Sequence, residues 1–418
     1  MKRIAIVGGG ISGLSTALLG AGRGLQCKVF EREYKPGGLI RCETIAGSLF
    51  HLCGGHVFNT KNQKVADWFW SKFDRERDWI KANRRSAVCL EDGRFVDYPI
   101  ENHVYQVGWN VERAFLNEMN DLIRNPCPAP GNFDDFLRTR FGKTLYQLYF
   151  RPYNMKVWRR NLSEVPLSWL EGKLPMPTYQ EMIDANRHHL EETGFVHSTF
   201  YYEKRGGSQS IADTLAKDVD IAYNTPVETI ACAHDGRCRV NGELFDAVAF
   251  CGNIKDLPEM LQGVDLGGFA AEIDKLESHG TTAVFCETDP IPYSWFYQPS
   301  GHHDSHRVIC TGNFSPGNNA SGKMTCTVEF TDEMAEDEIK RQLELMPYHP
   351  RYLTHHFSRY SYPIQHGQTR QMIADLKKAL NPHSIKLVGR FAEWEYFNMD
   401  AAIGSAMDCL DQMNWEIR

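Results

Sequence analysis

The start of the chain combines two hydrophobic patterns. Arg3–Val7 is a continuous apolar run rich in β-branched residues, as expected of a strand buried on both faces of a parallel sheet. Residues 12–24 carry apolar side chains at helical spacing, and residues 27–31 form a second strand pattern. The order strand, helix, strand predicts a β-α-β unit at the N-terminus.

Helical and strand patterns dominate different parts of the remaining chain. Amphipathic helices are predicted at residues 111–124 and 134–149, in a mainly helical segment that ends near residue 190. From residue 255 to 365 the pattern favours strands, and the C-terminus then returns to a strand and a helix. The other predicted elements are a short helix after Gly206–Ser208, strands at Val227–Ile230, Asp246–Cys251, Thr281–Cys286, Arg307–Thr311, Met324–Phe330 and Ser384–Arg390, and a helix at Asp400–Met413.

Composition limits the class of protein. At 418 residues the chain is too long for one simple core, so two or three subdomains are expected. With 46 Lys and Arg against 53 Asp and Glu, the net charge of −7 argues against a general nucleic-acid binder. An anionic substrate would need arginines placed locally in its site, because the overall field repels it.

The cysteines and the N-terminal sequence indicate a cytoplasmic enzyme. The 12 cysteines are scattered without a Cys-x-x-Cys pair, so we expect them to be reduced and to bind no metal. No signal peptide precedes the first strand, and no apolar run reaches the roughly twenty residues of a membrane span. We therefore expect no membrane insertion.

A glycine-rich turn follows the first strand. Gly8 allows the turn, Gly10 admits a pyrophosphate, and Gly13 lets the helix pack closely on the strand. The helix N-terminus, where Ser12 lies, points free N–H groups and its positive dipole end at the phosphates. Glu31 would accept hydrogen bonds from the adenosine ribose and disfavours a 2′-phosphate. These residues predict a site for NAD or FAD.

The next segment favours FAD. Lys35–Arg41 contains a double glycine, and Gly38, Leu39 and Arg41 are its candidate cofactor-binding residues. The stretch resembles the Gly-Gly-x-x-Arg/Asn sequence of flavin amine oxidases, protoporphyrinogen oxidases and sugar mutases, which nicotinamide dehydrogenases lack. Its position directly after the ribose-binding acid indicates a flavin dinucleotide.

The run Phe50–Thr60 narrows the chemistry. Gly54 and Gly55 let bare backbone approach a flat ligand, and His56 places a polar ring beside that approach. The run resembles Phe-His-x-x-Gly-x-His-x-Phe-His-Thr of the UDP-galactopyranose mutase family and departs from it at Asn59. We therefore expect the two glycines and His56 to lie against the flavin ring.

A second block, Gly389–Asp400, resembles the mutase sequence Gly-Arg-x-x-x-Tyr-x-Tyr-x-Asp-Met-Asp. The resemblance places Arg390 near the flavin and the substrate, Tyr396 on the nucleotide diphosphate and Met399 at the flavin pyrimidine. Asn398 stands where the family has Asp. Its amide could hydrogen-bond a sugar hydroxyl but could not neutralise a cation.

Further blocks supply candidates for substrate binding. Residues 151–158 resemble Tyr-x-x-Lys-Gln-Trp of the mutases, in which the tryptophan and its neighbours line the base and sugar. The resemblance implies that Lys173 replaces one diphosphate-binding Arg and that Arg307 is the other. The expected substrate-binding residues are Asn102, Tyr153, Trp158, Lys173, Arg307, Tyr362, Tyr396 and Asn398. The expected catalytic residues are Arg307, Arg390, Tyr396, Tyr362, Lys173 and His56, and Val227 is expected on the adenine side of FAD.

The resemblance implies a fold and a reaction. The fold is α/β: a discontinuous Rossmann-like FAD-binding domain (1–92, 200–255 and 380–418), an inserted helical substrate domain (103–195) and an antiparallel β-sheet substrate domain (93–102 and 256–379). The reaction interconverts the pyranose and furanose forms of a nucleoside-diphosphate sugar. N5 of reduced FAD attacks the anomeric carbon, forms a flavin–sugar adduct and expels the diphosphate. An external reductant such as NAD(P)H would keep the flavin reduced.

Two other functions stay open. A redox enzyme of the protoporphyrinogen oxidase or amine oxidase type shares the N-terminal flavin motifs. An inactive protein that only binds sugar nucleotides would explain the departures at Asn59, Asn398 and Lys173. The sequence names neither the base nor the sugar, and it leaves open whether the chain forms a homodimer.

Other residue groups carry no predicted chemistry. Adjacent histidines in a strand face opposite sides and cannot easily share one metal. We expect no metal site, and we expect His188–His189, His302–His303, His306 and His355–His356 at the surface. Trp394 is expected in the core.

Overall fold

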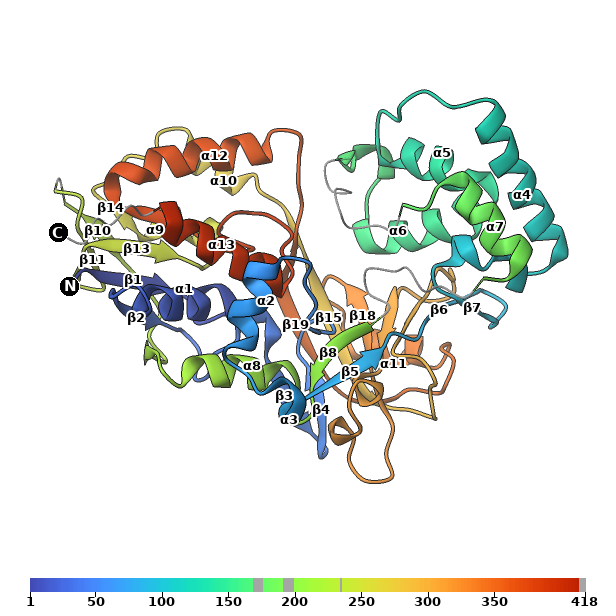
Figure 1. The fold of residues 1–418 in the computed structure, drawn as a ribbon, viewed down its shortest axis with the longest axis horizontal. Coiled ribbons are helices and arrows are strands. Elements are labelled where there is room, and N and C mark those ends of the chain that lie inside the picture. Colours follow the sequence, from blue (N-terminus) through green and yellow to red (C-terminus); the bar gives the residue numbers. More distant parts are fainter. Residues whose placement is uncertain (168–175, 191–198, 234, 413–418) are drawn as a thin grey trace.

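Three lobes make up the molecule (Figure 1). This computed structural model describes residues 1–167, 176–190, 199–233 and 235–412. An α/β lobe built on a five-stranded parallel sheet holds the region of both termini, a helical lobe lies at the far end, and a large twisted sheet lies below and between them (Figure 1). The α/β lobe takes its strands from the start, the middle and the end of the chain.

The parallel sheet of the α/β lobe is buried on both faces, which explains its continuous apolar runs. On its first strand Ile4 and Ile6 face a core shared with Ala17 and Ala406. The alternate residues face the opposite core, since side chains along a strand alternate between the faces. In order across the sheet the strands are β20 (Ile385–Leu387), β13 (Ala247–Phe250), β1 (Arg3–Val7), β2 (Gln26–Phe30) and β9 (Asp220–Ala222). Helices of this lobe are α1 (Ile11–Ala21), α2 (Gln63–Trp70), α3 (Arg75–Asp78), α8 (Gly207–Ala216), α9 (Leu257–Met260), α10 (Phe269–Asp274), α12 (Thr369–Leu380) and α13 (Met399–Gln412).

A four-stranded sheet covers one side of this lobe and corrects two predictions. Its strands are β12 (Glu243–Phe245), β11 (Cys238–Val240), β10 (Ile230–Cys232) and β14 (Leu261–Gln262). The hairpin register puts Cys232 opposite Cys238, and a disulfide joins them with the Cα atoms 4.1 Å apart. The prediction that all cysteines are reduced is therefore wrong for this pair, which hairpin pairing creates and sequence spacing does not reveal. The predicted strand Val227–Ile230 is wrong as well, because only Ile230 enters a strand and Val227 is buried in a loop.

The helical lobe contains α4 (Trp109–Arg124), α5 (Phe133–Leu145), α6 (Arg151–Trp158) and α7 (Tyr179–His188). The single helix predicted at 134–149 is broken at Gly142, whose φ of 72° and ψ of 167° are not helical. Glu118 on α4 explains the break, because its carboxylate accepts hydrogen bonds from the Thr144 amide (2.9 Å) and hydroxyl (2.7 Å). A π-helical segment, Tyr146–Phe150, then leads into α6.

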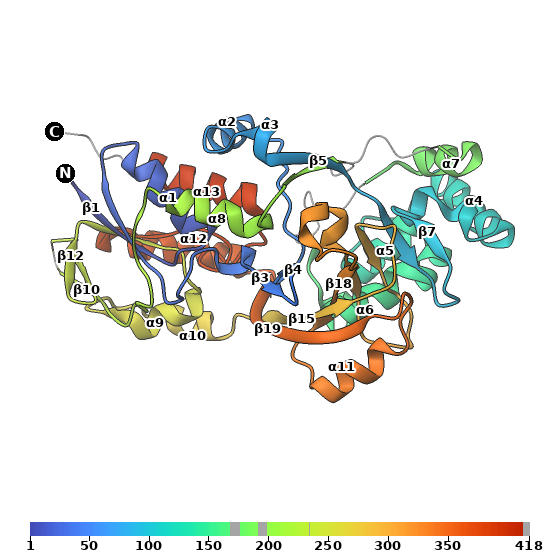
Figure 2. The same cartoon turned by 90° about the horizontal axis from the view of Figure 1, so that it is seen from below.

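The large sheet has seven strands, and its edge strand β19 is long and curved (Figure 2). The predicted strands near 281, 307 and 324 all occur in it, although the 255–365 segment also contains three helices. The strand that begins at Ser86 pairs with this sheet, as does the strand that begins at Phe95. In order the strands are β19 (Arg351–Pro363), β15 (Ser278–Glu287), β18 (Thr325–Thr331), β17 (Arg307–Ile309), β16 (Trp295–Tyr297), β6 (Ser86–Cys89) and β7 (Phe95–Asp97). Helix α11 (Glu336–Leu343) lies outside this sheet. Two two-stranded ribbons complete the fold: β3 (Cys42–Ile45) with β4 (Ser48–His51), and β5 (Trp79–Asn83) with β8 (Thr199–Glu203).

The helical lobe is fixed to the large sheet by a shared core. Val88, Tyr297 and Ile364 from the sheet pack in one cluster with Phe115 and Leu137 of the helices. Lys156 on α6 adds polar anchors, because its Nζ donates to the carbonyls of residues 298 and 305, each at 2.9 Å. Helix α6 is therefore held over the sheet edge, where its side chains can contribute to a site between the lobes.

Candidate functional site

The first part of the site is the glycine-rich turn between β1 and α1. Gly8 has a φ of +103°, and a Cβ on Gly13 would lie 1.9 Å from the Gly8 carbonyl oxygen. Both positions therefore require glycine. A Cβ on Gly10 would meet no described atom closer than 3.9 Å, so the N-terminus of α1 is open to a ligand. Glu31 is only 6% exposed, and its carboxylate accepts hydrogen bonds from the amides of Gly9 (2.6 Å) and Glu33 (2.9 Å).

A second glycine turn lies against the first. The Gly37 amide donates to the Gly9 carbonyl at 2.9 Å, and a Cβ on Gly38 would come within 3.3 Å of the Gly10 Cα. Leu39 and Arg41 are half-buried beside this contact. The Nε of Arg41 is buried and has no hydrogen-bond partner among the described residues.

The segment around Val227 and the C-terminal loop complete this end of the site. Val227 is buried two residues beyond Thr225, whose amide donates to the Glu31 carbonyl at 2.9 Å. Gly389 has a φ of +94°, and a Cβ there would lie 2.1 Å from the Ser12 hydroxyl oxygen. The end of β20 thus closes on the first turn of α1. The structure brings these predicted dinucleotide-binding residues together from four separate parts of the chain.

The Gly54–His56 turn follows β4 and lies against the large sheet. Gly54 has a φ of +71°, and its amide donates to Glu329 Oε1 at 2.9 Å. A Cβ on Gly55 would come within 2.9 Å of the Ile309 side chain, so glycine is required there by packing as well. The His56 amide donates to the ring of His51 at 3.1 Å. The turn is therefore anchored on the large sheet and on β4.

Several polar atoms beside this turn have no partner within the described chain. They are Nε2 of His56 and both Nε and Nη2 of Arg390, all of them buried. Burial, together with the charges of Arg390 and Arg307, lowers the pKa of His56 to about 4, so its ring is neutral near pH 7. Buried donors and acceptors are normally paired in proteins, so these atoms fit a polar ligand between them.

A buried ion pair forms the floor of the site. Arg307 on β17 lies directly across from Glu329 on β18, and Arg307 Nε donates to Glu329 Oε2 at 2.7 Å. Glu329 is 1% exposed, while the Arg307 side chain keeps 19% exposure. Arg307 Nη2 also lies 3.4 Å from the Tyr362 hydroxyl. One carboxylate thus holds both the Gly54 amide and the Arg307 guanidinium.

Glu329 is absent from the residues predicted from the sequence. The signal was present, because Thr325–Thr331 is a strand in which every residue is buried and Glu329 is its one acid. A buried carboxylate needs a cationic or hydrogen-bonding partner. An acid inside an otherwise uncharged strand pattern is therefore a reason to look for such a partner.

Two tyrosines and a second arginine complete the cationic end. The Tyr362 and Tyr396 rings stack with centroids 5.7 Å apart. The Arg390 guanidinium lies 4.3 Å from the Tyr396 ring centroid and 5.3 Å from that of Tyr362. Burial raises the pKa of Tyr362, so its hydroxyl stays protonated and available to donate. Four predicted residues, Arg307, Arg390, Tyr362 and Tyr396, therefore converge on one region.

The helical lobe contributes a different set. Tyr153 on α6 packs edge-on against Tyr297, with centroids 5.5 Å apart, and lies 6.5 Å from His306. Trp158 instead is buried in the core of the helical lobe, with its ring 6.4 Å from that of Phe133.

The other predicted substrate residues lie in different places. Asn102 is buried after β7, Asn398 is exposed just before α13, and Met399 is buried at the start of that helix. The Asn59 side-chain amide donates to the Thr199 carbonyl on β8 at 3.2 Å. Lys173 lies outside the described residues.

The histidines correct one prediction and the tryptophan confirms another. His303 and His306 are buried rather than at the surface, because the loop between β16 and β17 folds beneath α6. Burial lowers the pKa of both imidazoles, that of His303 to about 4. Trp394 is fully buried, as predicted, and its indole N–H donates to the Ile364 carbonyl at 3.1 Å.

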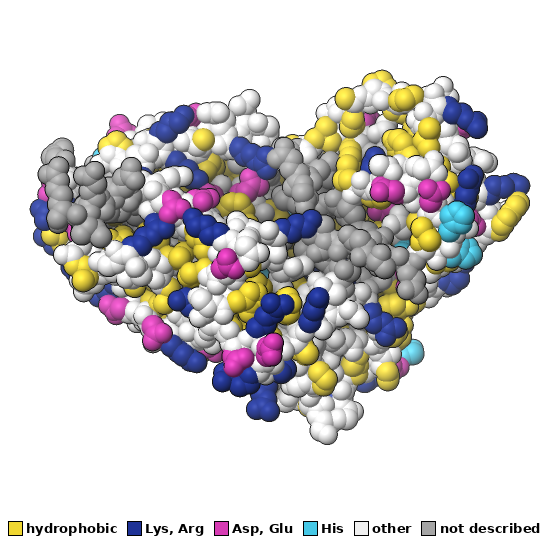
Figure 3. Space-filling model, viewed as in Figure 1, with side chains coloured by type: hydrophobic (Ala, Val, Ile, Leu, Met, Phe, Trp, Pro, Cys, Tyr) yellow, Lys and Arg dark blue, Asp and Glu magenta, His cyan; other side chains and the backbone are white. Residues whose placement is uncertain are grey.

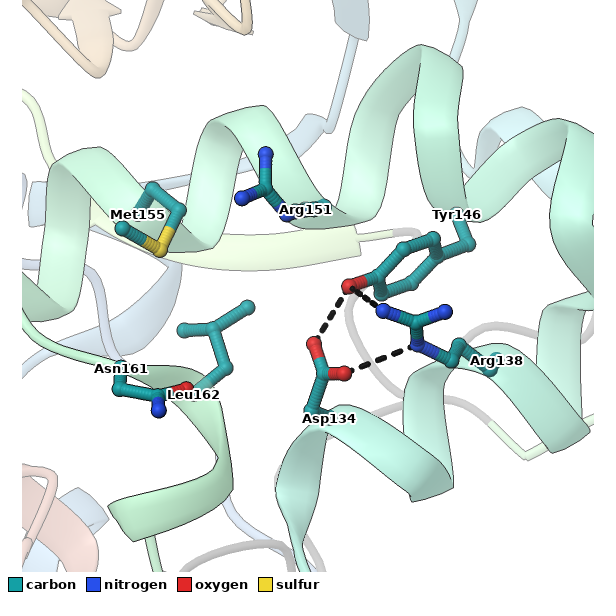
Figure 4. Close-up of a pocket in the computed structure, with 7 residues that line it drawn as sticks. All are labelled: Asp134, Arg138, Tyr146, Arg151, Met155, Asn161 and Leu162. Atoms are coloured by element: carbon teal, nitrogen blue, oxygen red, sulfur yellow. Dashed lines mark hydrogen bonds and ion pairs between the residues drawn. The ribbon is translucent and has the colours of Figure 1, made fainter.

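A pocket of about 380 Å³ in the helical lobe is a weaker candidate (Figure 4). Asp134 accepts hydrogen bonds from Arg138 Nε at 2.8 Å and from the Tyr146 hydroxyl at 2.5 Å. Arg138 Nη2 also donates to that hydroxyl at 3.0 Å, so the three groups pair with one another. This arrangement stabilises the helix packing and leaves no cluster of unpaired donors like the one beside His56.

The outline of the molecule is hollowed between the α/β lobe and the helical lobe (Figure 3). In the described ranges no group of three or more His, Cys, Asp or Glu is arranged to hold a metal ion. A search of the same ranges finds no helix with the length and apolarity needed to cross a membrane.

Comparisons with known proteins agree with the motifs. Residues 6–73 match the model of an NAD(P)-binding Rossmann-like domain. A protein of Klebsiella pneumoniae named "Probable UDP-galactopyranose mutase" is 24% identical, with 98% of this chain and 94% of the relative aligned. The dTDP-fucopyranose mutase of Escherichia coli is 23% identical, with coverages of 98% and 97%. The resemblance to nucleotide-sugar mutases predicted from the sequence is confirmed over nearly the whole chain, and these relatives are isomerases.

Solved structures confirm the fold. The crystal structure of reduced UDP-galactopyranose mutase superposes with a TM-score of 0.88, at 21% identity and with 99% of this chain and 93% of that one covered. Putrescine oxidase superposes with a TM-score of 0.64, at 15% identity and 99% coverage of both chains. The predicted α/β architecture with a Rossmann-like unit is therefore correct, and enzymes with different reactions share it.

Proposed function

We propose that this chain is a flavin-dependent mutase that interconverts the pyranose and furanose forms of a nucleoside-diphosphate sugar. The observation that carries the proposal is the convergence of two guanidiniums and two phenols beside the neutral His56 ring and the Gly54–His56 turn. Such a set suits a ligand with a flat ring at one end and a diphosphate at the other.

The residues present fit FAD. The open N-terminus of α1 would hold the pyrophosphate, Glu31 the adenosine ribose, and the turn at Gly54 the flavin ring. The unpartnered nitrogens of His56 and Arg390 would find partners on the flavin or the sugar. An external reductant such as NAD(P)H would keep the bound FAD in its reduced form. Reduced FAD would supply, through N5, a nucleophile for the anomeric carbon of the sugar.

The protein's own part is to bind and release the diphosphate. In the proposal Arg307 and Arg390 bind the diphosphate oxygens, and the hydroxyls of Tyr362 and Tyr396 donate to them. Preorganised donors of this kind stabilise the charge that develops as the diphosphate departs and returns. Glu329 keeps Arg307 in place before the substrate arrives, so little reorganisation accompanies the reaction.

The relatives support the same function, because proteins named UDP-galactopyranose mutase and dTDP-fucopyranose mutase align with the whole chain. They bind different bases and sugars, so they do not name the substrate of this chain. Asn59 and Asn398, which replace His and Asp of the family pattern, are the residues we expect to change sugar recognition.

The second candidate is a flavin oxidoreductase of the amine oxidase or protoporphyrinogen oxidase type. It is favoured by the fold shared with putrescine oxidase. The convergence of Arg307 and Arg390 argues against it, since an amine or a porphyrinogen offers no diphosphate for two cations.

The test is a screen of nucleotide sugars with the FAD-loaded protein after dithionite reduction. We expect chromatography to show a furanose product from at least one UDP-, dTDP- or GDP-sugar. Oxygen consumption with an amine or porphyrinogen and no isomerisation would favour the oxidoreductase. Tight nucleotide-sugar binding without any isomerised product would favour an inactive binding protein.

A further inference from the structure

A buried chain of hydrogen bonds lies behind the Gly54–His56 turn. His51, the last residue of β4, is fully buried, and its Nδ1 accepts from the His56 amide at 3.1 Å. Its Nε2 lies 2.8 Å from the hydroxyl of Tyr202, which is 2% exposed. Asn318 Nδ2 donates to the same hydroxyl at 2.9 Å and to the Thr311 carbonyl at 2.8 Å.

The chain has one direction. A backbone amide can only donate, so His51 Nδ1 must accept and the ring proton must sit on Nε2, from which it is donated to Tyr202. Burial, with a smaller contribution from His56, lowers the pKa of His51 well below its ordinary value. A neutral ring with a single tautomer satisfies both requirements.

The His51 ring cannot turn freely. It is stacked between His56, at 5.8 Å between ring centroids, and Tyr202, at 5.9 Å. A Cβ on Gly207 would lie 2.6 Å from the Tyr202 hydroxyl and 3.3 Å from His51 Nε2, so the space behind the pair is already full. The His56 end of the turn therefore has a rigid support, as the Gly54 end has in Glu329.

We propose that His51 is a positioning residue for the flavin. His51 fixes the orientation of the Gly55–His56 peptide and thereby decides which polar group of this peptide faces the flavin ring. This inference rests on the proposed function, because it requires a flavin at the turn. Reduced and oxidised flavins differ in charge and in hydrogen bonding, so the orientation of a neighbouring peptide changes their relative affinities. His51 lies behind the turn, so its effect reaches the flavin through His56 and leaves the affinity for the sugar nucleotide unchanged.

Two substitutions separate the two ends of the ring. His51→Asn places a carbonyl oxygen near the position of Nδ1 and keeps an acceptor for His56. His51→Gln reaches toward Tyr202 but removes that acceptor. We expect Gln to change the ratio of affinities for reduced and oxidised flavin about tenfold, which is about 30 mV for a two-electron couple. We expect Asn to change the ratio less than about threefold, which is about 14 mV.

The measurement is a spectroscopic redox titration of the FAD-loaded variants, with kcat and KM determined beside it. In His51→Gln we expect kcat to fall with the potential shift while KM stays within about twofold. The matched control is His355→Gln on β19, where a histidine Nδ1 also lies 2.7 Å from a tyrosine hydroxyl, that of Tyr352. We expect this control to keep the wild-type potential.

Three results would decide the inference. A His51→Gln protein with the wild-type potential and kcat would overturn it. Should that variant not fold, His51→Leu also removes the acceptor for the His56 amide, and a wild-type potential in it would equally overturn the inference. A wild-type protein that binds no FAD would overturn the proposed function, and this inference with it.

Discussion

Glu329→Gln is the substitution that most sharply tests how the site is held together. The two oxygens of Glu329 accept from different donors, Oε1 from the Gly54 amide at 2.9 Å and Oε2 from Arg307 Nε at 2.7 Å. Glutamine has the same shape but only one oxygen, so its NH₂ group must face one of these two donors. One contact breaks, and the charge that neutralises Arg307 is lost.

The size of the effect follows from the burial of the pair. A hydrogen bond to a charged group contributes about 1.5–3 kcal/mol, and removing one partner of a fully buried ion pair costs about 3–5 kcal/mol. Glu329 is 1% exposed but the Arg307 side chain retains 19%, so water can partly replace the lost partner. We therefore expect a loss of about 2 kcal/mol in the free energy of unfolding. We also expect kcat/KM to fall about 30-fold if the same energy is lost from the transition state.

Urea denaturation followed by tryptophan fluorescence measures the first quantity. The control is Glu336→Gln, which removes an exposed ion pair with Lys340 on α11 and should leave the free energy of unfolding close to that of the wild type. If Glu329→Gln is as stable as this control and keeps wild-type kcat/KM, Glu329 does not hold the site and the reasoning is wrong.

Three further predictions concern separate parts of the site. Gly13→Ala puts a Cβ 1.9 Å from a carbonyl oxygen and should destabilise the protein by at least about 3 kcal/mol in urea titration. The control Gly22→Ala, at a helical φ of −63° with no described neighbour closer than 3.5 Å, should change stability by less than about 1 kcal/mol. Equal losses in the two variants would contradict the packing argument. Arg390→Lys should raise the Kd for the nucleotide sugar at least about tenfold in calorimetric titration, because Lys cannot form the forked contacts of a guanidinium. Its stability should change by less than about 1 kcal/mol, and an unchanged Kd would show that Arg390 does not bind the substrate. The folded-state pKa of His56, about 4, is below its unfolded value of 6.5, so the stability from the neutral ring is complete above pH 6.5. This stability falls by up to about 1.4 kcal/mol per pH unit toward pH 4. The free energy of unfolding of His56→Gln should depend less steeply on pH, and a slope as steep as that of the wild type would contradict this prediction.

Local patterns predicted the elements that depend on local sequence. The apolar run of β1 and the three glycines of the first turn gave the β-α-β unit, because a buried parallel strand and a phosphate turn each need particular residues at fixed spacing. The break at Gly142 was missed because it depends on Glu118, which lies 26 residues away from Thr144. The Cys232–Cys238 disulfide was missed because only the hairpin register puts the two thiols opposite each other.

In the candidate site, too, some residues could be predicted from local sequence, whereas others depend on contacts between distant parts of the chain. Arg307, Arg390, Tyr362 and Tyr396 could be selected because blocks of sequence around them resemble a family pattern, and the structure places them together. Glu329 and His51 act on the site from behind, through contacts with backbone amides. No motif marks Glu329, whereas His51 is a fixed position of the Phe50–Thr60 pattern, which does not reveal that its partner is a backbone amide. Such supporting residues become visible only when the distances are known.

The balance of electrons tests the central claim most directly. A mutase changes the ring form of its substrate without net oxidation, so the reduced protein should convert many equivalents of nucleotide sugar for each equivalent of reductant supplied. We predict that anaerobic turnover by the dithionite-reduced, FAD-loaded protein gives furanose product far in excess of the electrons consumed, and that the oxidised protein gives none. Consumption of one two-electron equivalent for each product molecule, or product formed only by the oxidised protein, would contradict the account.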